Sequence, residues 1–117
     1  MMYGRIDVKK LFVSVPMKGR TKEEIEYSIT KMHSIAEAYE GEELKLIDSW
    51  APEALPPTDC NISVWHLGKS IEKLAMADVF IGIEDSIHYP GCMIEKQVAA
   101  NYGIKSYIIP QNVILFN

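Results

Sequence analysis

The chain has 117 residues, 48% of them hydrophobic, and a formal net charge of −4. This length is close to the commonest size of one domain, and the apolar content suffices for a core and excludes a disordered chain. The acidic balance argues against a nucleic-acid partner, although a local loop can still bind a small anion. Because no run is long enough to cross a bilayer and no signal peptide is present, we expect no membrane partner.

The two cysteines, Cys60 and Cys92, have neither metal-binding nor redox spacing. Two thiols without such a pattern are typical of a reduced compartment, so the sequence favours a cytoplasmic protein. No metal or redox cofactor is implied.

The first predicted element is a strand over residues 10–15, apolar on both faces as in the centre of a parallel sheet. After a loop, Thr21 and Glu24 form the capping-box pattern, which predicts a helix with one apolar face that ends near Gly41. His33 lies beside that face. Because no second ligand lies at metal spacing, we interpret it as an ordinary surface or boundary histidine.

A short strand over 44–47 and a proline-rich loop over 51–61 come next. Asn61 or Ser63 then caps a second helix that ends near Ala77. This helix is predicted to turn four apolar residues inward: Val64, Leu67, Ile71 and Leu74.

A third strand begins at Asp78, and a third helix ends at residues 101–103. The fourth strand covers 106–109. Residues 113–116, apolar throughout, are predicted to form a fifth strand or an interface patch.

Alternating strands and helices indicate right-handed crossovers and a parallel sheet covered on both faces. Ligands bind such sheets outside the carboxyl ends of the strands. Three polar segments are predicted to meet there: residues 14–20, 48–50 and 84–95.

The segment from Tyr89 to Ala99 is predicted to turn from the third strand into a helix. Pro90 suits a helix start, and Gly91 permits close approach of the backbone to a ligand. Glu95 falls in the first or second turn, where the helix dipole favours an ionised carboxylate. Its helical face is otherwise small and mostly apolar. Glu95 is therefore either a functional carboxylate or a residue that reaches solvent or pairs with a distant side chain.

The loop over residues 14–20 leads to a helix N-terminus, which favours an anion. Ser14 offers a hydroxyl, Gly19 lets the backbone approach, and Lys18 or Arg20 adds charge. The alternative is a plain turn with solvated cations. The two tryptophans can stack on a base or pack as core, and we favour core for Trp65 and a pocket wall for Trp50.

Residues 13–19, Val-Ser-Val-Pro-Met-Lys-Gly, resemble the first strand and loop of nucleoside 2-deoxyribosyltransferase-like proteins. They are most similar to a small phage-associated branch of unknown function with a Ser-x-Pro-Met-x-Gly form. Residues 67–79 look like the family's second helix and third strand, and Gly91 to Glu95 resembles its Gly-x-x-x-Glu helix start. The resemblance covers residues 10–110.

The resemblance implies one domain over 1–117 with a three-layer, doubly wound, flavodoxin- or Rossmann-like α/β fold. Its sheet would have four or five mainly parallel strands. It also implies a nucleoside deoxyribosyltransferase or N-hydrolase in which Glu95 attacks the anomeric carbon of a nucleoside or nucleoside 5′-monophosphate. A homo-oligomer is implied as well.

Two family acids are replaced here, by Ser70 and Tyr89. Ser70 also occurs in the phage-associated branch. Proton donors to the leaving base are then, in order of preference, Asp85, Glu84, His88 and Tyr89, so Glu95 and Asp85 are the predicted catalytic pair. The predicted substrate-binding residues are Ser14, Pro16, Met17, Lys18, Gly19, Trp50, Ser70, Glu84, Tyr89 and Gly91.

The loss of two carboxylates leaves a second hypothesis open, a nucleotide-binding module that senses or sequesters its ligand without chemistry. A third and weaker hypothesis is a structural interaction protein that binds no nucleotide.

Overall fold

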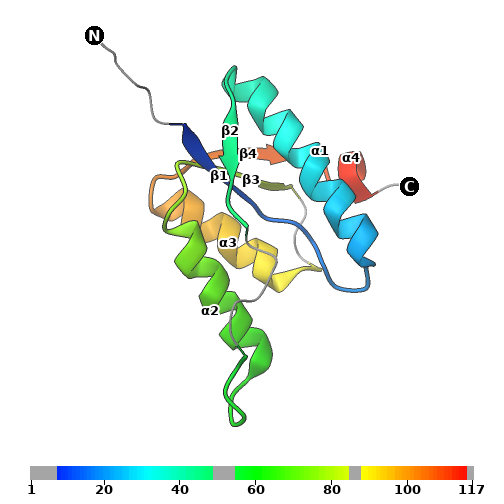
Figure 1. The fold of residues 1–117 in the computed structure, drawn as a ribbon, viewed down its shortest axis with the longest axis vertical. Helices are drawn as coiled ribbons and strands as arrows, with labels where there is room; N and C mark the ends of the chain where they lie inside the picture. Colours follow the sequence, from blue (N-terminus) through cyan, green and yellow to red (C-terminus); the bar gives the residue numbers. More distant parts are fainter. Residues whose placement is uncertain (1–7, 49–54, 85–87, 116–117) are drawn as a thin grey trace.

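The computed structural model describes residues 8–48, 55–84 and 88–115. Four strands form one all-parallel sheet in the order β2-β1-β3-β4 (Figure 1). The strands are β1 (Lys9–Val13), β2 (Leu44–Leu46), β3 (Val79–Ile83) and β4 (Lys105–Ile109). Helices cover both faces, so the predicted three-layer α/β fold of the Rossmann or flavodoxin type is confirmed.

The two central strands are buried on both faces. Leu11 of β1 is opposite Leu46 on one side and Val79 on the other, and all of β3 is buried. The near-continuous apolar run at the start of the sequence therefore marks a central strand, as predicted.

The first helix, α1 (Lys22–Glu40), has the predicted boundaries. The Thr21 hydroxyl accepts from the Glu24 N–H, and the Glu24 carboxylate accepts from the Thr21 N–H. At the other end, Gly41 adopts φ 75°, a left-handed conformation in which glycine is favoured. The capping box and the terminal glycine thus delimit the helix.

The other helices are α2 (Ile62–Leu74), α3 (Pro90–Asn101) and the short α4 (Asn112–Leu115). Asn61 caps α2 by accepting from the Val64 N–H, and Pro90 occupies the first turn of α3 as predicted. In the described part of the chain, no helix combines the length and hydropathy needed to cross a membrane.

The two faces of the sheet have cores of unequal size. The face covered by α1 and α4 has the larger core, with Leu11, Val13, Met32, Ile81 and Ile114 among its buried residues. Among the described residues, the hydrophobic cluster on the face covered by α2 and α3 has four buried members: Phe12, Leu74, Phe80 and Ala99. The smaller core leaves room on the second face, and the candidate site lies there.

The predicted fifth strand is wrong. Residues 112–115 form α4, stabilised by local bonds from the Val113 and Ile114 N–H groups to the carbonyls of Pro110 and Gln111. One helical turn after Pro110 buries Ile114 against α1, and the sheet has four strands in the part of the chain that the structure describes.

The predicted inward face of α2 is only partly correct. Leu74 is buried and Ile71 packs against the Phe12 cluster, but Val64 is 61% exposed. The N-terminal half of α2 extends beyond the sheet (Figure 1), so its apolar positions have no strand to pack against.

Candidate active site

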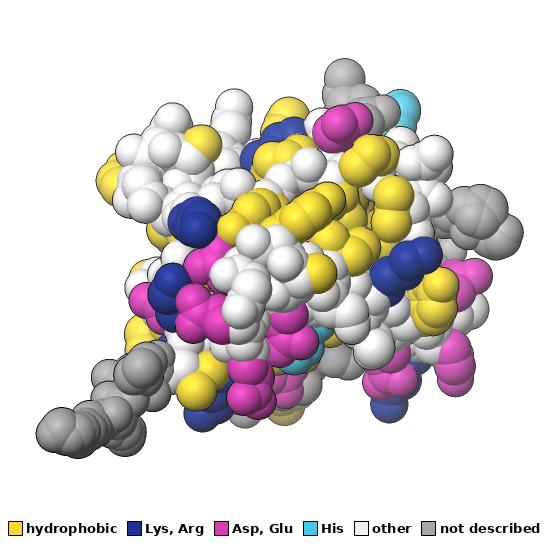
Figure 2. Space-filling view, turned by 90° about the horizontal axis from the view of Figure 1, so that it is seen from above, with side chains coloured by type: hydrophobic (Ala, Val, Ile, Leu, Met, Phe, Trp, Pro, Cys, Tyr) yellow, Lys and Arg dark blue, Asp and Glu magenta, His cyan; other side chains and the backbone are white. Residues whose placement is uncertain are grey.

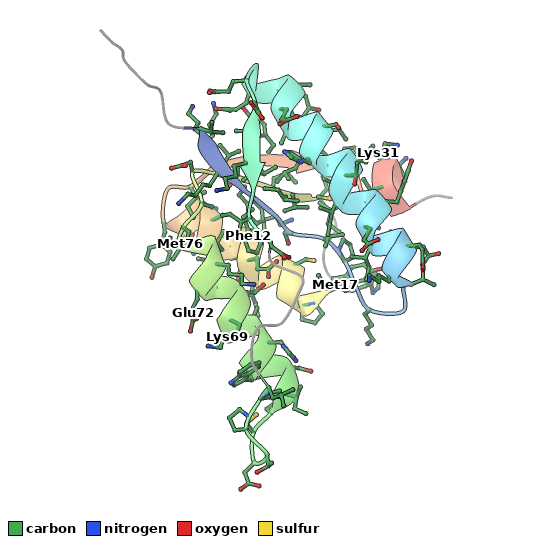
Figure 3. The ribbon with its side chains drawn as sticks, in the orientation of Figure 1. Phe12, Met17, Lys31, Lys69, Glu72 and Met76 are labelled. Carbon is green, nitrogen blue, oxygen red and sulfur yellow. The ribbon has the colours of Figure 1, made fainter. Side chains whose placement is uncertain are left out.

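A cavity of about 850 Å³ lies between α2, α3 and the loop after β1. Figure 3 shows Lys69 and Glu72 along α2 and Met76 just beyond its end, with Phe12 and Met17 toward the other side of this space. The cavity opens at the carboxyl ends of β1 and β3, where the chain order of the sheet reverses. This is the position at which open α/β sheets bind ligands.

Glu95 lies in the second turn of α3, lines the cavity and is 8% exposed. The Ser14 hydroxyl, at the end of β1, donates a hydrogen bond of 2.7 Å to its Oε1 atom. The Ser70 hydroxyl on α2 also favours the ionised carboxylate. Three elements therefore converge on one side chain.

Burial raises the pKa of Glu95, and the hydroxyls of Ser14 and Ser70 oppose that rise. The helix start was expected to keep this carboxylate charged, but desolvation is the larger effect. Of the structural alternatives for Glu95, exposure to solvent is not observed, and the distant partner that it does meet is a neutral hydroxyl, that of Ser14. The side chain does not reach open solvent, and within the described ranges it forms no ion pair.

Cys92 lies one helical turn before Glu95 and also lines the cavity, with 7% of its surface exposed. Burial raises the pKa of its thiol to about 11; the Ser14 hydroxyl opposes this rise, and the nearby Glu95 carboxylate adds to it. The thiol is therefore protonated at neutral pH. The sequence prediction assigned Cys92 no role, although its spacing of three residues from Glu95 places both on one helical face.

The loop after β1 contributes Met17 and the exposed Lys18 to the cavity, while Pro16 and Gly19 do not line it. Gly19 instead shapes the turn with φ 76°. The Arg20 guanidinium donates to the Pro16 carbonyl at 2.8 Å and to Ser28 Oγ at 2.6 Å, so it stabilises the fold.

The predicted anion site at the start of α1 is weakened by the first turn of that helix. Glu23 and Glu24 lie there, and the Glu24 N–H is already satisfied by Thr21. An anion in this place would meet two carboxylates, so Lys18 is the cation that this loop offers to the cavity.

Of the predicted proton donors, His88 and Tyr89 line the cavity. Glu84 is exposed and does not line it, and its backbone carbonyl accepts from Lys96 Nζ at 2.8 Å. Asp85 and Trp50 lie outside the described residues. Gly91 lines the cavity, and a Cβ atom built there would meet nothing within 4 Å.

Trp65 is not core, contrary to the prediction. It is half-buried and lines the cavity, with Lys69 Nζ 5.4 Å from its ring centroid and the His66 ring in edge contact. The extension of α2 beyond the sheet leaves no core for it to enter. Six lining residues of α2 had no predicted role in a site: Ser63, His66, Leu67, Lys69, Glu72 and Lys73. Met76, just beyond the end of α2, also lines the cavity.

Comparisons with protein-family models, with curated proteins and with solved structures find no match. Among the described residues, no group of three or more His, Cys, Asp or Glu side chains is arranged to hold a metal ion. Fold and site together define a class: a doubly wound α/β protein with a large pocket at the switch point of its sheet and one buried carboxylate in that pocket.

Proposed function

We propose that this protein cleaves or exchanges the N-glycosidic bond of a nucleoside or nucleoside 5′-monophosphate, as a nucleoside 2-deoxyribosyltransferase-like enzyme. The observation that carries the proposal is Glu95, a buried carboxylate that lines a cavity and is held by hydroxyl groups. A buried carboxylate without a cation is costly to the fold and is typical of a functional site.

In the proposed reaction, a Glu95 carboxylate oxygen attacks the anomeric carbon of the sugar. The carbon–nitrogen bond breaks, its electron pair leaves with the base, and the base takes up a proton. The sugar is then held on Glu95 as an ester, which water or a second base cleaves to regenerate the carboxylate. His88 and Tyr89 are the candidate donors of that proton within the cavity lining.

The volume of the cavity supports a substrate the size of a nucleoside or nucleoside 5′-monophosphate. Ligand pockets of about 300–1,000 Å³ accommodate molecules of drug size, and about 850 Å³ falls within that range. Trp65 provides an aromatic surface for a base, and Lys18 provides a cation for a phosphate.

The test is a scan of nucleosides and 5′-monophosphates by mass spectrometry, which detects free base and sugar bound to the protein. We expect a covalent adduct at Glu95 in the parent and neither adduct nor free base with Glu95→Ala, whose fold should stay intact. Glu72→Gln is the matched control, because Glu72 lines the same cavity but its side chain is 69% exposed. Base release by Glu95→Ala at the parental rate would contradict the assignment.

The second candidate function is a nucleotide-binding module without chemistry. It is favoured by the serine at position 70, where the classical enzymes have an aspartate, and by the raised pKa of Glu95, because only the ionised form attacks. This candidate predicts that a nucleotide raises the melting temperature while no base is released at any pH.

We also propose that the chain forms a homo-oligomer through the exposed side of α2. Ile62 and Val64 near its start and Met76 just beyond its end are each more than half exposed. Figure 2 shows that apolar side chains also gather on the face seen from above. Light scattering after size exclusion measures the molar mass and tests this proposal. If α2 forms the interface, Val64→Glu should have a molar mass closer to that of the monomer than the parent has.

A further inference from the structure

Ser14 lies behind Glu95 as seen from the cavity. It is 1% exposed and does not line the cavity, yet its hydroxyl donates to Glu95 Oε1 at 2.7 Å. A side chain in this place does not reach a bound molecule while Glu95 keeps its position. The predicted role of Ser14 in binding substrate therefore does not fit its location.

The backbone around Ser14 is fixed by the sheet. Its N–H donates to the Ile81 carbonyl at 2.9 Å, which extends the pairing of β1 with β3. Beside it, a Cβ atom on Gly82 would approach the Phe80 ring to 2.8 Å and the Ser14 Cβ to 3.7 Å. The glycine therefore leaves the Phe80 ring in place next to Ser14, and the hydroxyl extends from a well-packed strand.

None of the other described neighbours of Glu95 provides it with a positive charge, and the 2.7 Å hydrogen bond from Ser14 is its shortest defined contact in the structure. Cys92 is the titratable side chain beside it on α3, and the thiol stays protonated at neutral pH. The Lys96 ammonium is bound to the carbonyls of Ile83 and Glu84, and α2 contributes the Ser70 hydroxyl. Within the described residues, the Glu95 carboxylate is therefore stabilised by neutral hydroxyl groups, whereas a lysine or arginine stabilises most buried carboxylates.

We propose that Ser14 is a positioning residue: from the strand beneath the cavity it holds one oxygen of Glu95 and thereby fixes the direction in which the other oxygen meets a ligand. The two oxygens of a carboxylate share one plane, so holding the first restricts the second. Attack on a sugar carbon requires such alignment, and a displacement of about 1 Å costs on the order of 10²-fold in rate. The catalytic part of this inference rests on the proposed function, whereas the orienting contact does not.

The first measurement needs no substrate. The carboxyl ¹³C signal of Glu95 is titrated in the parent, in Ser14→Ala and in Ser28→Ala. Ser28 is the matched control, because it is a serine of equal burial whose hydroxyl binds the Ile114 carbonyl on the other face of the sheet. We expect Ser14→Ala to move the titration of Glu95 to higher pH and Ser28→Ala to leave it unchanged. If Ser14→Ala does not fold, Ser14→Cys keeps the size of the side chain with a weaker donor, and the shift should have the same direction.

The second measurement is base release by the same variants. Ser14→Ala should lower kcat by about 10- to 100-fold with KM changed less than twofold, and should move the acidic limb of the pH profile upward. Ser28→Ala should do neither, because Arg20 still holds the loop after β1 through the Pro16 carbonyl.

The outcomes separate the two proposals. An unchanged Glu95 titration in Ser14→Ala overturns the positioning role, whatever the activity. A shifted titration in a protein that releases no base upholds the orienting contact and refutes the proposed reaction. A shifted titration with parental kcat and an unmoved pH profile shows that the contact does not align the reacting atom, which also overturns the inference.

Discussion

Glu40 and Glu95 lie at opposite ends of the strands, and different groups stabilise their carboxylates. Glu40, the last residue of α1, lies at the amino ends of the strands, with Lys9 Nζ at 3.0 Å and Lys105 Nζ at 2.8 Å. These lysines and the Tyr107 hydroxyl lower its pKa to about 2. Glu95, at the carboxyl ends, contacts hydroxyl groups, and its pKa is raised.

The two sites differ in what remains for a ligand. The charge of Glu40 is neutralised by lysines, and Figure 2 shows lysine or arginine side chains interspersed with acidic ones on the surface seen from above. The charge of Glu95 is not neutralised by the described residues and lies in a cavity. The comparison indicates a structural role for the first glutamate and a chemical role for the second.

The largest expected difference between the two is in activity. Glu95→Gln should lower base release by roughly 10³-fold or more, because an amide does not replace a carboxylate nucleophile. Glu40→Gln should change it less than threefold. Base release is measured as free base per minute. An equal loss of activity in both variants would contradict the different roles assigned to Glu40 and Glu95.

The next largest effect is on stability. Glu40→Ala should lower the free energy of unfolding at pH 7 by about 1–2 kcal/mol, since it leaves Lys9, Lys105 and Tyr107 without their shared partner. Because the pKa of Glu40 is depressed, its stabilisation is present above pH 4.5 and is lost as pH falls toward 2. Urea unfolding at pH 7 and pH 3 should therefore show a larger penalty at pH 7.

Glu95→Gln should raise the stability of the fold, whereas Glu40→Ala lowers it. The raised pKa of Glu95 means that its protonated form stabilises the fold below about pH 4.5, and this contribution is lost as pH rises through the folded pKa. The melting temperature of Glu95→Gln should therefore exceed that of the parent, by a margin that widens between pH 4 and pH 8. A margin that shrinks over this range would mean that the carboxylate is not desolvated.

The smallest effect is chemical and concerns the two free cysteines. Cys60 is exposed and Cys92 is buried, with a pKa of about 11 instead of 9.0. At pH 8 this leaves Cys92 about a hundredth of the ordinary thiolate fraction, so iodoacetamide should label Cys60 at least about 10²-fold faster. Peptide mass spectrometry gives both rates, and a ligand in the cavity should slow Cys92 further without affecting Cys60.

Local features were predictable because local interactions determine them. Thr21, Glu24 and Gly41 set the ends of α1 through bonds within a few residues, and Pro90 does so for the start of α3. The small and mostly apolar helical neighbours of Glu95 were consistent with its burial, but the pattern alone left solvent exposure and a distant partner open.

The predictions that failed depended on which neighbour a side chain meets in the folded chain. Trp65 and Val64 lie on a helix of normal amphipathic pattern, and only the extension of α2 past the sheet exposes them. The hydroxyl of Ser14 is separated from Glu95 by 81 positions, and Arg20 binds groups of its own loop and helix that a charge pattern does not reveal. In each case the spacing predicted the element but not which neighbour its side chain would meet.

The contacts of Arg20 connect two distant parts of the molecule. Its guanidinium holds Pro16 and Ser28, and the Ser28 hydroxyl donates to the carbonyl of Ile114 in α4 at 3.2 Å. The wall of the pocket formed by Met17 and Lys18 is thereby tethered to the last helix. We therefore expect a fusion or label attached after α4 to disturb that wall more than one placed before β1, and ligand assays should use the second arrangement.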